Sequence, residues 1–196
     1  RYISDWADAL DERLKFDCEL FLPGHGFPII GKTRIKLALE TTSSFLRTIE
    51  DQTLKLMNQG KSLNQVLHEV EIPENLMNHA WLTPIYDDPQ FLIRMIWRRY
   101  GGWWDGEYDR LLPSPRKAEA IAWVELSGGI ENIISKALEQ SNQENYAVAA
   151  HLIETAFHAD HSNEKTHKAR SEIYRKFSLK QSSSMGRNIL NHASLA

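Results

Sequence analysis

Apolar residues recur at intervals of three and four positions along most of this chain, which is the spacing of an amphipathic α-helix. The longest stripe of this kind covers residues 35–57 and predicts one long helix that ends at Gly60. Ser62 is a suitable cap for a shorter helix over residues 63–70. From this pattern we expect residues 32–196 to contain only helices and loops.

The helical pattern continues through the second half of the chain. One helix is predicted to end at Gly101-Gly102, and Pro113-Ser114-Pro115 supplies a cap and a first-turn proline for the next. Four more apolar helix faces follow, centred on Ile133, Ile153, Ile173 and Ile189. Small residues on these faces favour antiparallel helical hairpins with tetratricopeptide-like packing, although no 34-residue repeat is present. The predicted fold class is therefore mainly α.

The first thirty residues follow a different pattern. Residues 4–14 predict a short amphipathic helix with Ser4 as its N-cap and Trp6 on its apolar face. The apolar run 18–22 predicts a buried strand that Pro23-Gly24 terminates. A helix, a strand and a glycine-rich loop make one unit of a layered α/β domain, and no later segment is predicted to supply neighbouring strands. We expect a short α/β remnant before the helical region.

Composition and charge remove several classes of function. The net charge is −3 and both signs are interspersed, so nucleic acid is not an expected partner. No apolar run approaches the ~18 residues of a spanning helix, so no transmembrane segment is expected. Cys18 is the only cysteine, which excludes an internal disulfide and a paired-cysteine zinc site. The sequence starts at Arg1 rather than methionine, so we expect a fragment, and localisation stays unassigned.

His25 is the one candidate metal ligand. It follows the predicted strand and lies between Gly24 and Gly26, where the backbone can approach a ligand closely. A neutral imidazole is a common zinc ligand in hydrolases. A simple loop histidine has the same sequence pattern, so both interpretations stay open from the residues alone.

A second group of histidines is better explained by a turn. His158, Asp160 and His161 match the end of a His-x-His-x-Asp-His zinc motif, but Ala156 stands where the first histidine would be. The segment also joins two predicted helices, so Asp160 and Ser162 are expected to be turn and cap residues. We therefore predict no metal site here.

Two further groups have open interpretations. Arg94, Arg98 and Arg99 share a predicted helix and could bind an anion, although pairing with nearby aspartates is the simpler explanation. Four large aromatic residues lie close together at 97, 100, 103 and 104, which suits either an interface or cleft or the packing of a helix-to-loop corner. No Ser-His-Asp order, P-loop or dinucleotide-binding glycine motif occurs. No catalytic or organic-cofactor-binding residue is predicted.

An ordered series of motifs resembles one enzyme family over nearly the whole chain. Residues 22–31, Leu-Pro-Gly-His-Gly-Phe-Pro-Ile-Ile-Gly, resemble the last metal-binding motif of metallo-β-lactamase-fold hydrolases. Residues 51–60 resemble the helix that follows this motif in the alkyl sulfatase branch. The later motifs resemble the dimerisation region of that branch, and they are Tyr100–Gly106, Leu112-Pro113, Glu125–Gly129 and Met185–Ile189.

This resemblance implies a parent enzyme that hydrolyses alkyl sulfate esters with a two-zinc centre. The histidine that matches His25 would bind one zinc ion, and the other ligands would come from an upstream His-x-His-x-Asp-His motif and acidic residues that this sequence lacks. Residues 1–31 would be the end of the metallo-β-lactamase-like domain, and residues 32–196 a helical domain that forms a homodimer. By itself this fragment would be inactive. The alternative hypothesis is a non-catalytic helical adaptor that binds a peptide or protein.

Overall fold

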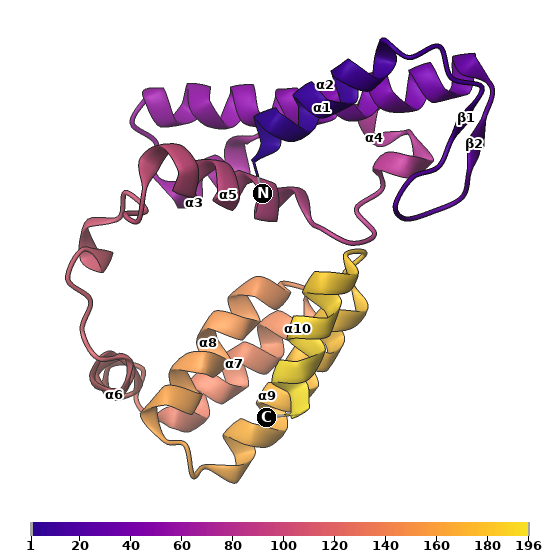
Figure 1. Cartoon of the computed structure of the whole chain (residues 1–196). Helices are drawn as coiled ribbons and strands as arrows, with labels where there is room; N and C mark the ends of the chain where they lie inside the picture. Colours follow the sequence, from indigo (N-terminus) through magenta and orange to yellow (C-terminus); the bar gives the residue numbers. More distant parts are fainter. Residues whose placement is uncertain (1, 196) are drawn as a thin grey trace. The chain divides into compact units, whose positions relative to one another are not determined.

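The computed structural model describes residues 2–195, which form two compact units. Unit 1 contains residues up to 84 together with 89–111, and unit 2 contains residues 85–88 together with those from 112 onward. Both units are built from helices, and the strands of the described residues are confined to one short hairpin near the start (Figure 1). The predicted fold class, mainly α after a short α/β segment, is confirmed. No helix within residues 2–195 is long and apolar enough to cross a membrane.

Unit 1 is organised around its longest helix. Its elements are α1 (Ile3–Leu14), β1 (Leu20–Phe21), β2 (Ile29–Ile30), α2 (Lys32–Asn58), α3 (Leu63–Glu69), α4 (Glu74–Met77), the 3₁₀ turn Ala80–Leu82, α5 (Pro89–Gly101) and the 3₁₀ turn Tyr108–Arg110. Helix α2 packs against both α1 and α5. Its residues Leu46 and Ile49 are almost fully buried beside Ile96 of α5 and Val66 of α3. The apolar stripe of α2 therefore forms the centre of this core, as its spacing predicts.

Helix α3 begins at the predicted cap. The Ser62 hydroxyl accepts a hydrogen bond from the Gln65 backbone N–H at 3.4 Å, and the Gln65 side chain accepts one from the Ser62 N–H at 2.9 Å. This reciprocal capping box satisfies two backbone donors that a helix start otherwise leaves unpaired. Gly60, at φ 76°, makes the preceding turn in a backbone conformation that side chains disfavour.

Helix α1 differs from its prediction in its cap and in its buried face. It begins at Ile3 with Tyr2 as N-cap, and the Ser4 hydroxyl donates to Glu50 of α2 instead of capping α1. Ile3 and Ala7 are its buried residues, whereas Trp6 is 41% exposed. The expected roles of Ser4 and Trp6 were wrong, because the Ser4 hydroxyl bonds to a distant helix and α1 buries the side that carries Ile3 and Ala7.

The strand predicted over residues 18–22 is present, but it is shorter and more exposed than expected. Only Leu20 and Phe21 form a strand, and they pair antiparallel with Ile30 and Ile29. Leu20 is 53% exposed, because a two-stranded sheet has no further strand or helix layer on that side. The apolar sequence correctly predicts a strand, but burial requires neighbours that the described residues do not supply.

Unit 2 is a stack of helices joined by short turns. Its elements are α6 (Arg116–Leu126), α7 (Ile130–Asn142), α8 (Tyr146–Ala159), α9 (Glu164–Leu179) and α10 (Ser184–Leu195). Consecutive helices from α7 to α10 pack against each other (Figure 1). Ile153 and Ile173 are completely buried with Ala137 and Ala149 between the helices. The predicted hairpin faces therefore form the core of this unit. Each buried isoleucine contributes roughly 2–3 kcal/mol to folding.

Two details of unit 2 were not predicted from local pattern. Residues 85–88 reach the start of α10, where the Ile85 carbonyl accepts from the Ser184 N–H at 2.7 Å and the Tyr86 carbonyl accepts from the Ser183 hydroxyl at 2.6 Å. Pro115 is the N-cap of α6 rather than its first helical residue. The prediction that domains of a longer protein meet at residues 31 and 32 stays a prediction.

Candidate functional site

His25 lies at the tip of the hairpin formed by β1 and β2. The side chain is exposed, and it has no hydrogen bond or ion pair with the described residues. Gly24 and Gly26 flank it, and a Cβ atom built on either glycine meets nothing within 4 Å. An imidazole in such open surroundings can bind a metal ion. Within residues 2–195 no group of three histidine, cysteine or acidic side chains is placed to hold one.

The base of this hairpin is closed by charge pairs and a backbone hydrogen bond. Lys32, the first residue of α2, bonds to Asp17 and lies 3.7 Å from Glu19. The hydrogen bond to Asp17 raises the pKa of the Lys32 ammonium. The Gly31 N–H donates to the Glu19 carbonyl at 2.9 Å. The loop that carries His25 is therefore tied directly to the start of α2.

Helix α1, which precedes the hairpin, is held to α2 by a second set of charges. Arg47 of α2 binds Asp8 at 2.7 Å and Asp11 at 2.5 Å. Hydrogen bonds from Ser43 and then Arg47 hold the pKa of the Asp11 carboxyl below its ordinary value. The two aspartates are three positions apart, so they lie on the same face of α1 and bind one guanidinium together.

A buried carboxylate joins α1 to α2 and α5. Glu50 is 7% exposed, and its Oε1 atom accepts hydrogen bonds from Ser4 Oγ at 2.6 Å and from the Tyr100 hydroxyl at 3.1 Å. Arg99 of α5 lies 3.5 Å from Asp5 of α1. Both helices that flank the His25 hairpin are thus fixed in one packed unit, which limits how far the hairpin base can move.

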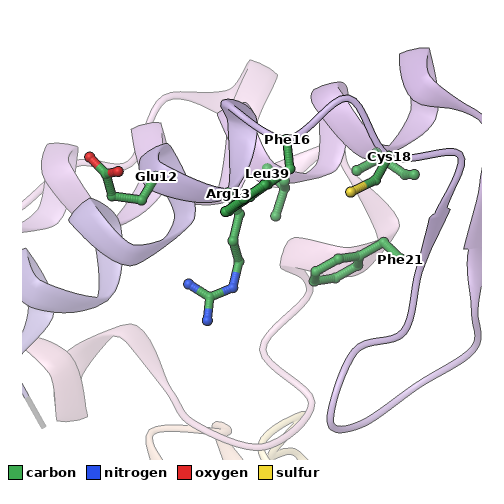
Figure 2. Close-up of a pocket in the computed structure, with 7 residues that line it drawn as sticks. Glu12, Arg13, Phe16, Cys18, Phe21 and Leu39 are labelled. Atoms are coloured by element: carbon green, nitrogen blue, oxygen red, sulfur yellow. The ribbon is translucent and has the colours of Figure 1, made fainter.

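An apolar hollow of about 410 Å³ lies beside the hairpin, and Figure 2 shows the side chains that line it, which come from α1, β1, α2 and the loop between α1 and β1. They include Phe16, Phe21 and Leu39, with Arg13 at the edge, where its guanidinium donates to the Ala9 carbonyl at 2.6 Å. Other large apolar side chains of this region are more than half exposed, namely those of Leu20, Leu22, Phe27 and Ile30. The hairpin region presents an uncovered apolar surface.

The histidines at the end of α8 form a packed turn, as predicted. Asp160 Oδ1 accepts hydrogen bonds from the Ser162 N–H at 2.9 Å and its hydroxyl at 2.7 Å, which lowers the pKa of Asp160. His158 and His161 place their rings against Phe157, with centroids 5.6 and 4.4 Å away. The cap of α9 is Asn163, which accepts from the Thr166 N–H, so the expected capping role of Ser162 was wrong.

The members of the arginine group and of the aromatic group on and after α5 have different contacts. Arg99 lies 3.5 Å from Asp5 of α1, and Asp105, an aspartate near it in the sequence, lies 3.3 Å from Arg110 instead. Trp97 is buried, and its indole N–H donates to the Trp104 carbonyl at 2.9 Å, which fixes the corner after α5. Trp103 is 79% exposed. Corner packing accounts for Trp97 and leaves Trp103 without a packing role inside the chain.

Comparison with known protein families matches residues 62–195 to the family described as alkyl sulfatase dimerisation. The chain belongs to this family. The match covers α3 to α10, which are all the helices that follow α2 in the described residues. The resemblance drawn from the later sequence motifs is confirmed.

The individual proteins that this chain resembles are distant from it in sequence. The chain is 26% identical over 87% of its length to a linear primary-alkylsulfatase from a Pseudomonas strain, and 23% identical over 94% to an alkyl/aryl-sulfatase from Saccharomyces cerevisiae. These alignments cover 33% and 29% of those two proteins. The chain spans about a third of the length of the curated relatives it matches, so it is similar to one part of each.

A solved structure has the same fold over the entire chain. A stereoselective inverting sec-alkylsulfatase from Pseudomonas superposes on all of this chain with a TM-score of 0.93 at 22% sequence identity. The superposition uses 31% of that enzyme. This chain therefore has the fold of the matching part of that enzyme although about four residues in five differ.

Proposed function

We propose that this chain is the C-terminal part of a zinc-dependent metallo-β-lactamase-fold hydrolase that acts on alkyl sulfate esters. In this proposal residues 1–31 end the catalytic α/β domain, and residues 32–196 are its dimerisation domain. The observation that carries it is the family match over residues 62–195. The curated relatives are named as alkylsulfatases, which favours sulfate esters among the many substrates of this enzyme fold.

The uncovered hairpin region supports a larger α/β domain at this end. A two-stranded sheet rarely stands alone, and exposed apolar patches on soluble proteins commonly mark a surface that something else covers. Phe27 is 91% exposed and Leu22 67% exposed, although both flank the His25 loop. In the proposed enzyme, further strands and helices of the catalytic domain cover these side chains.

His25 is the proposed zinc ligand of this chain. Its imidazole is accessible, Lys32 ties the base of its hairpin to α2, and Arg47 and Glu50 tie α1 to α2. Bound zinc would lower the pKa of a water molecule and polarise the ester. The role of the residues present is to hold one imidazole at the end of a hairpin whose base is fixed to α2.

Replacement of His25 in the full-length enzyme tests this assignment. We expect His25→Ala to remove about one zinc ion per chain, because a catalytic zinc ion keeps only three protein ligands and the loss of one weakens binding strongly. Zinc is measured by mass spectrometry of the purified protein, and hydrolysis is followed with a medium-chain alkyl sulfate. His68→Ala, an exposed histidine of α3, is the matched control. Unchanged zinc content and activity in His25→Ala would show that the assignment is wrong.

The enzyme and adaptor hypotheses make opposite predictions about the coding region before Arg1. An enzyme requires an in-frame His-x-His-x-Asp-His motif upstream, because the described residues hold no group of three metal-ligating side chains. Absence of that motif would contradict the hydrolase and leave the helical packing of unit 2 as a scaffold for protein binding. Membership of the alkyl sulfatase dimerisation family favours the enzyme.

A further inference from the structure

Residues 85–88 form a short segment that belongs to unit 2, although the residues before and after it belong to unit 1. Unit 1 contains the residues up to 84 and those from 89 to 111. The chain therefore enters unit 2 at residue 85, leaves it after residue 88 and enters it again at residue 112. Only the last entry continues into α6 to α10, so noncovalent contacts must hold residues 85–88 in unit 2.

The backbone carbonyls of this segment bind the start of α10. The Ile85 carbonyl accepts a hydrogen bond from the Ser184 N–H at 2.7 Å, and the Tyr86 carbonyl accepts one from the Met185 N–H at 3.3 Å. Ser184 and Met185 belong to the first turn of α10, whose N–H groups have no partner inside the helix. The inserted segment thus supplies acceptors that a helix start otherwise lacks.

Ser183 lies at the centre of this contact. It is 1% exposed, and its hydroxyl donates to the Tyr86 carbonyl at 2.6 Å while accepting a hydrogen bond from the Gly186 N–H at 3.1 Å. One hydroxyl therefore caps α10 and binds the inserted segment at the same time. The contacts of residues 85 and 86 with residues 183–185 are called the clasp below.

The side chains on the segment side of the clasp are mostly exposed. Ile85 is 67% exposed and Tyr86 is 58% exposed, so hydrogen bonds contribute more to this contact than apolar burial does. The net strength of a hydrogen bond in water is modest, because water replaces the partner when the contact opens. Regions with few buried apolar contacts open without global unfolding. The segment can therefore separate from α10 while the core around Ile153 stays folded.

The other end of α10 has an anchor of its own. Arg170 of α9 donates from Nη1 to the Ala193 carbonyl at 2.7 Å and from Nε to Glu154 of α8 at 2.7 Å. These bonds do not involve the clasp. Opening of the clasp consequently leaves α10 packed on α9 and changes only the attachment of residues 85–88.

Prolines stand at both borders of the inserted segment. Pro84 precedes it, and Pro89 follows it as the first residue of α5. Each proline ring fixes its own φ angle and restricts the residue before it to extended conformations. The segment is therefore stiff, and holding it on α10 costs less conformational entropy than holding a flexible loop would. A stiff segment also transmits its attachment to the chain on both sides.

We propose that the clasp is a releasable second tether between the two units of this chain. While the clasp is closed, the units are joined at two places, the clasp and the covalent passage at residues 111–112. When it opens, the passage at 111–112 is the only remaining tether, and the units gain freedom to move against each other. This inference goes beyond the proposed function and does not depend on hydrolysis, zinc or dimerisation.

Amide hydrogen exchange followed by NMR tests whether the clasp opens separately from the rest of unit 2. The Ser184 and Met185 amides report on it directly, because both donate to carbonyls of the segment. We expect them to exchange through an opening that low urea does not accelerate, and faster than the Ile153 amide in the core. Exchange of all three amides only through global unfolding would overturn the proposal.

Two substitutions weaken the clasp from opposite sides. Ser183→Ala should raise exchange of the Ser184 and Met185 amides about tenfold, because it removes the hydroxyl that binds the segment. Pro84→Gly should raise it about threefold through greater freedom of the open segment, and it changes no residue of α10. Ser178→Ala is the matched control, since Ser178 is also buried but donates only to the Arg175 carbonyl of its own helix. Exchange that Pro84→Gly leaves unchanged would show that Ser183 acts as a cap alone and would refute the clasp.

Pulsed electron paramagnetic resonance tests the tether itself. Spin labels on Lys55→Cys in α2 and Ser135→Cys in α7, both exposed positions, are placed in a Cys18→Ser background. An excess of unlabelled chain ensures that each measured distance lies within one chain, whatever the oligomeric state. Variants with a weakened clasp should broaden the distribution of label-to-label distances, and the control at residue 178 should leave it unchanged. Equal widths for the Ser183→Ala variant and the unsubstituted chain would refute the second tether.

Discussion

Replacing Glu50 with alanine would disrupt the junction that holds α1 against α2 and α5. The carboxylate is almost fully buried and accepts hydrogen bonds from Ser4 at 2.6 Å and Tyr100 at 3.1 Å. Hydrogen bonds to a charged group contribute about 1.5–3 kcal/mol each. Glu50→Ala removes both at once, together with the packing of the glutamate side-chain carbons.

Two effects reduce the loss below the sum of these contributions. Burial of a carboxylate costs several kcal/mol, and alanine relieves that cost. Tyr100 is half exposed, so water can reach its hydroxyl after the substitution. We therefore expect Glu50→Ala to lower the free energy of unfolding of unit 1 by about 2–3 kcal/mol.

Urea denaturation followed by tryptophan fluorescence measures this change. Five of the six tryptophans belong to unit 1, and they are Trp6, Trp81, Trp97, Trp103 and Trp104. Glu40→Ala, an exposed glutamate on the same helix, is the control and should change stability by no more than about 0.5 kcal/mol. A double-mutant cycle with Tyr100→Phe should give a coupling energy of about 1 kcal/mol. Equal stabilities of Glu50→Ala and Glu40→Ala, or a coupling near zero, would refute the junction.

Three further substitutions test the core, a helix cap and the α1–α2 contact. Ile153→Ala removes a fully buried side chain between α7, α8 and α9 and should destabilise unit 2 by about 3 kcal/mol in thermal or urea unfolding. Ser62→Ala breaks the capping box of α3 and should cost about 1 kcal/mol in the same assay, with lower amide protection at the start of α3. Because its hydrogen bonds lower the pKa of Asp11 below 3.8, this carboxylate stabilises the fold above that value and the contribution is lost as the pH falls further. Asp11→Asn should therefore be less stable than the unsubstituted protein at pH 7, and this difference should shrink as the pH falls below 3.8, whereas a constant difference would contradict this.

Most helices could be predicted from the sequence because their packing repeats a local spacing. The apolar stripe of α2 and the small inner faces of α7 to α10 face the same cores that their periodicity indicates. Ser62 could also be identified, because a capping box needs only residues three positions apart. Local pattern is sufficient wherever the partner of a residue lies within one or two helical turns.

Polar residues with distant partners could not be predicted in the same way. Ser4 bonds to Glu50, which is 46 positions away, and Arg47 reaches Asp8 and Asp11 on another helix. Residues around Ile85 bind the start of α10 about 100 positions later. Such contacts depend on how the helices fold together, so a serine that looks like a cap can instead be an interhelical donor.

The surroundings of the candidate metal ligand His25 also could not be predicted fully from the sequence. The motif around His25 could be read directly, and the structure places it on an exposed loop between two fixed helices. Burial of the neighbouring strand was predicted from its apolar residues and was wrong for Leu20 and Leu22. Apolar composition indicates that a surface must be covered, but it does not say whether this chain or another part of a protein supplies the cover.

The mass of the chain in solution tests the central claim most directly. The account predicts that this alkyl sulfatase dimerisation chain, which has a monomer mass of 22.6 kDa, sediments at equilibrium as a species of twice that mass at micromolar concentration. The expected mass is concentration-dependent only where the dimer dissociates. A single species of 22.6 kDa up to high micromolar concentration would contradict the account.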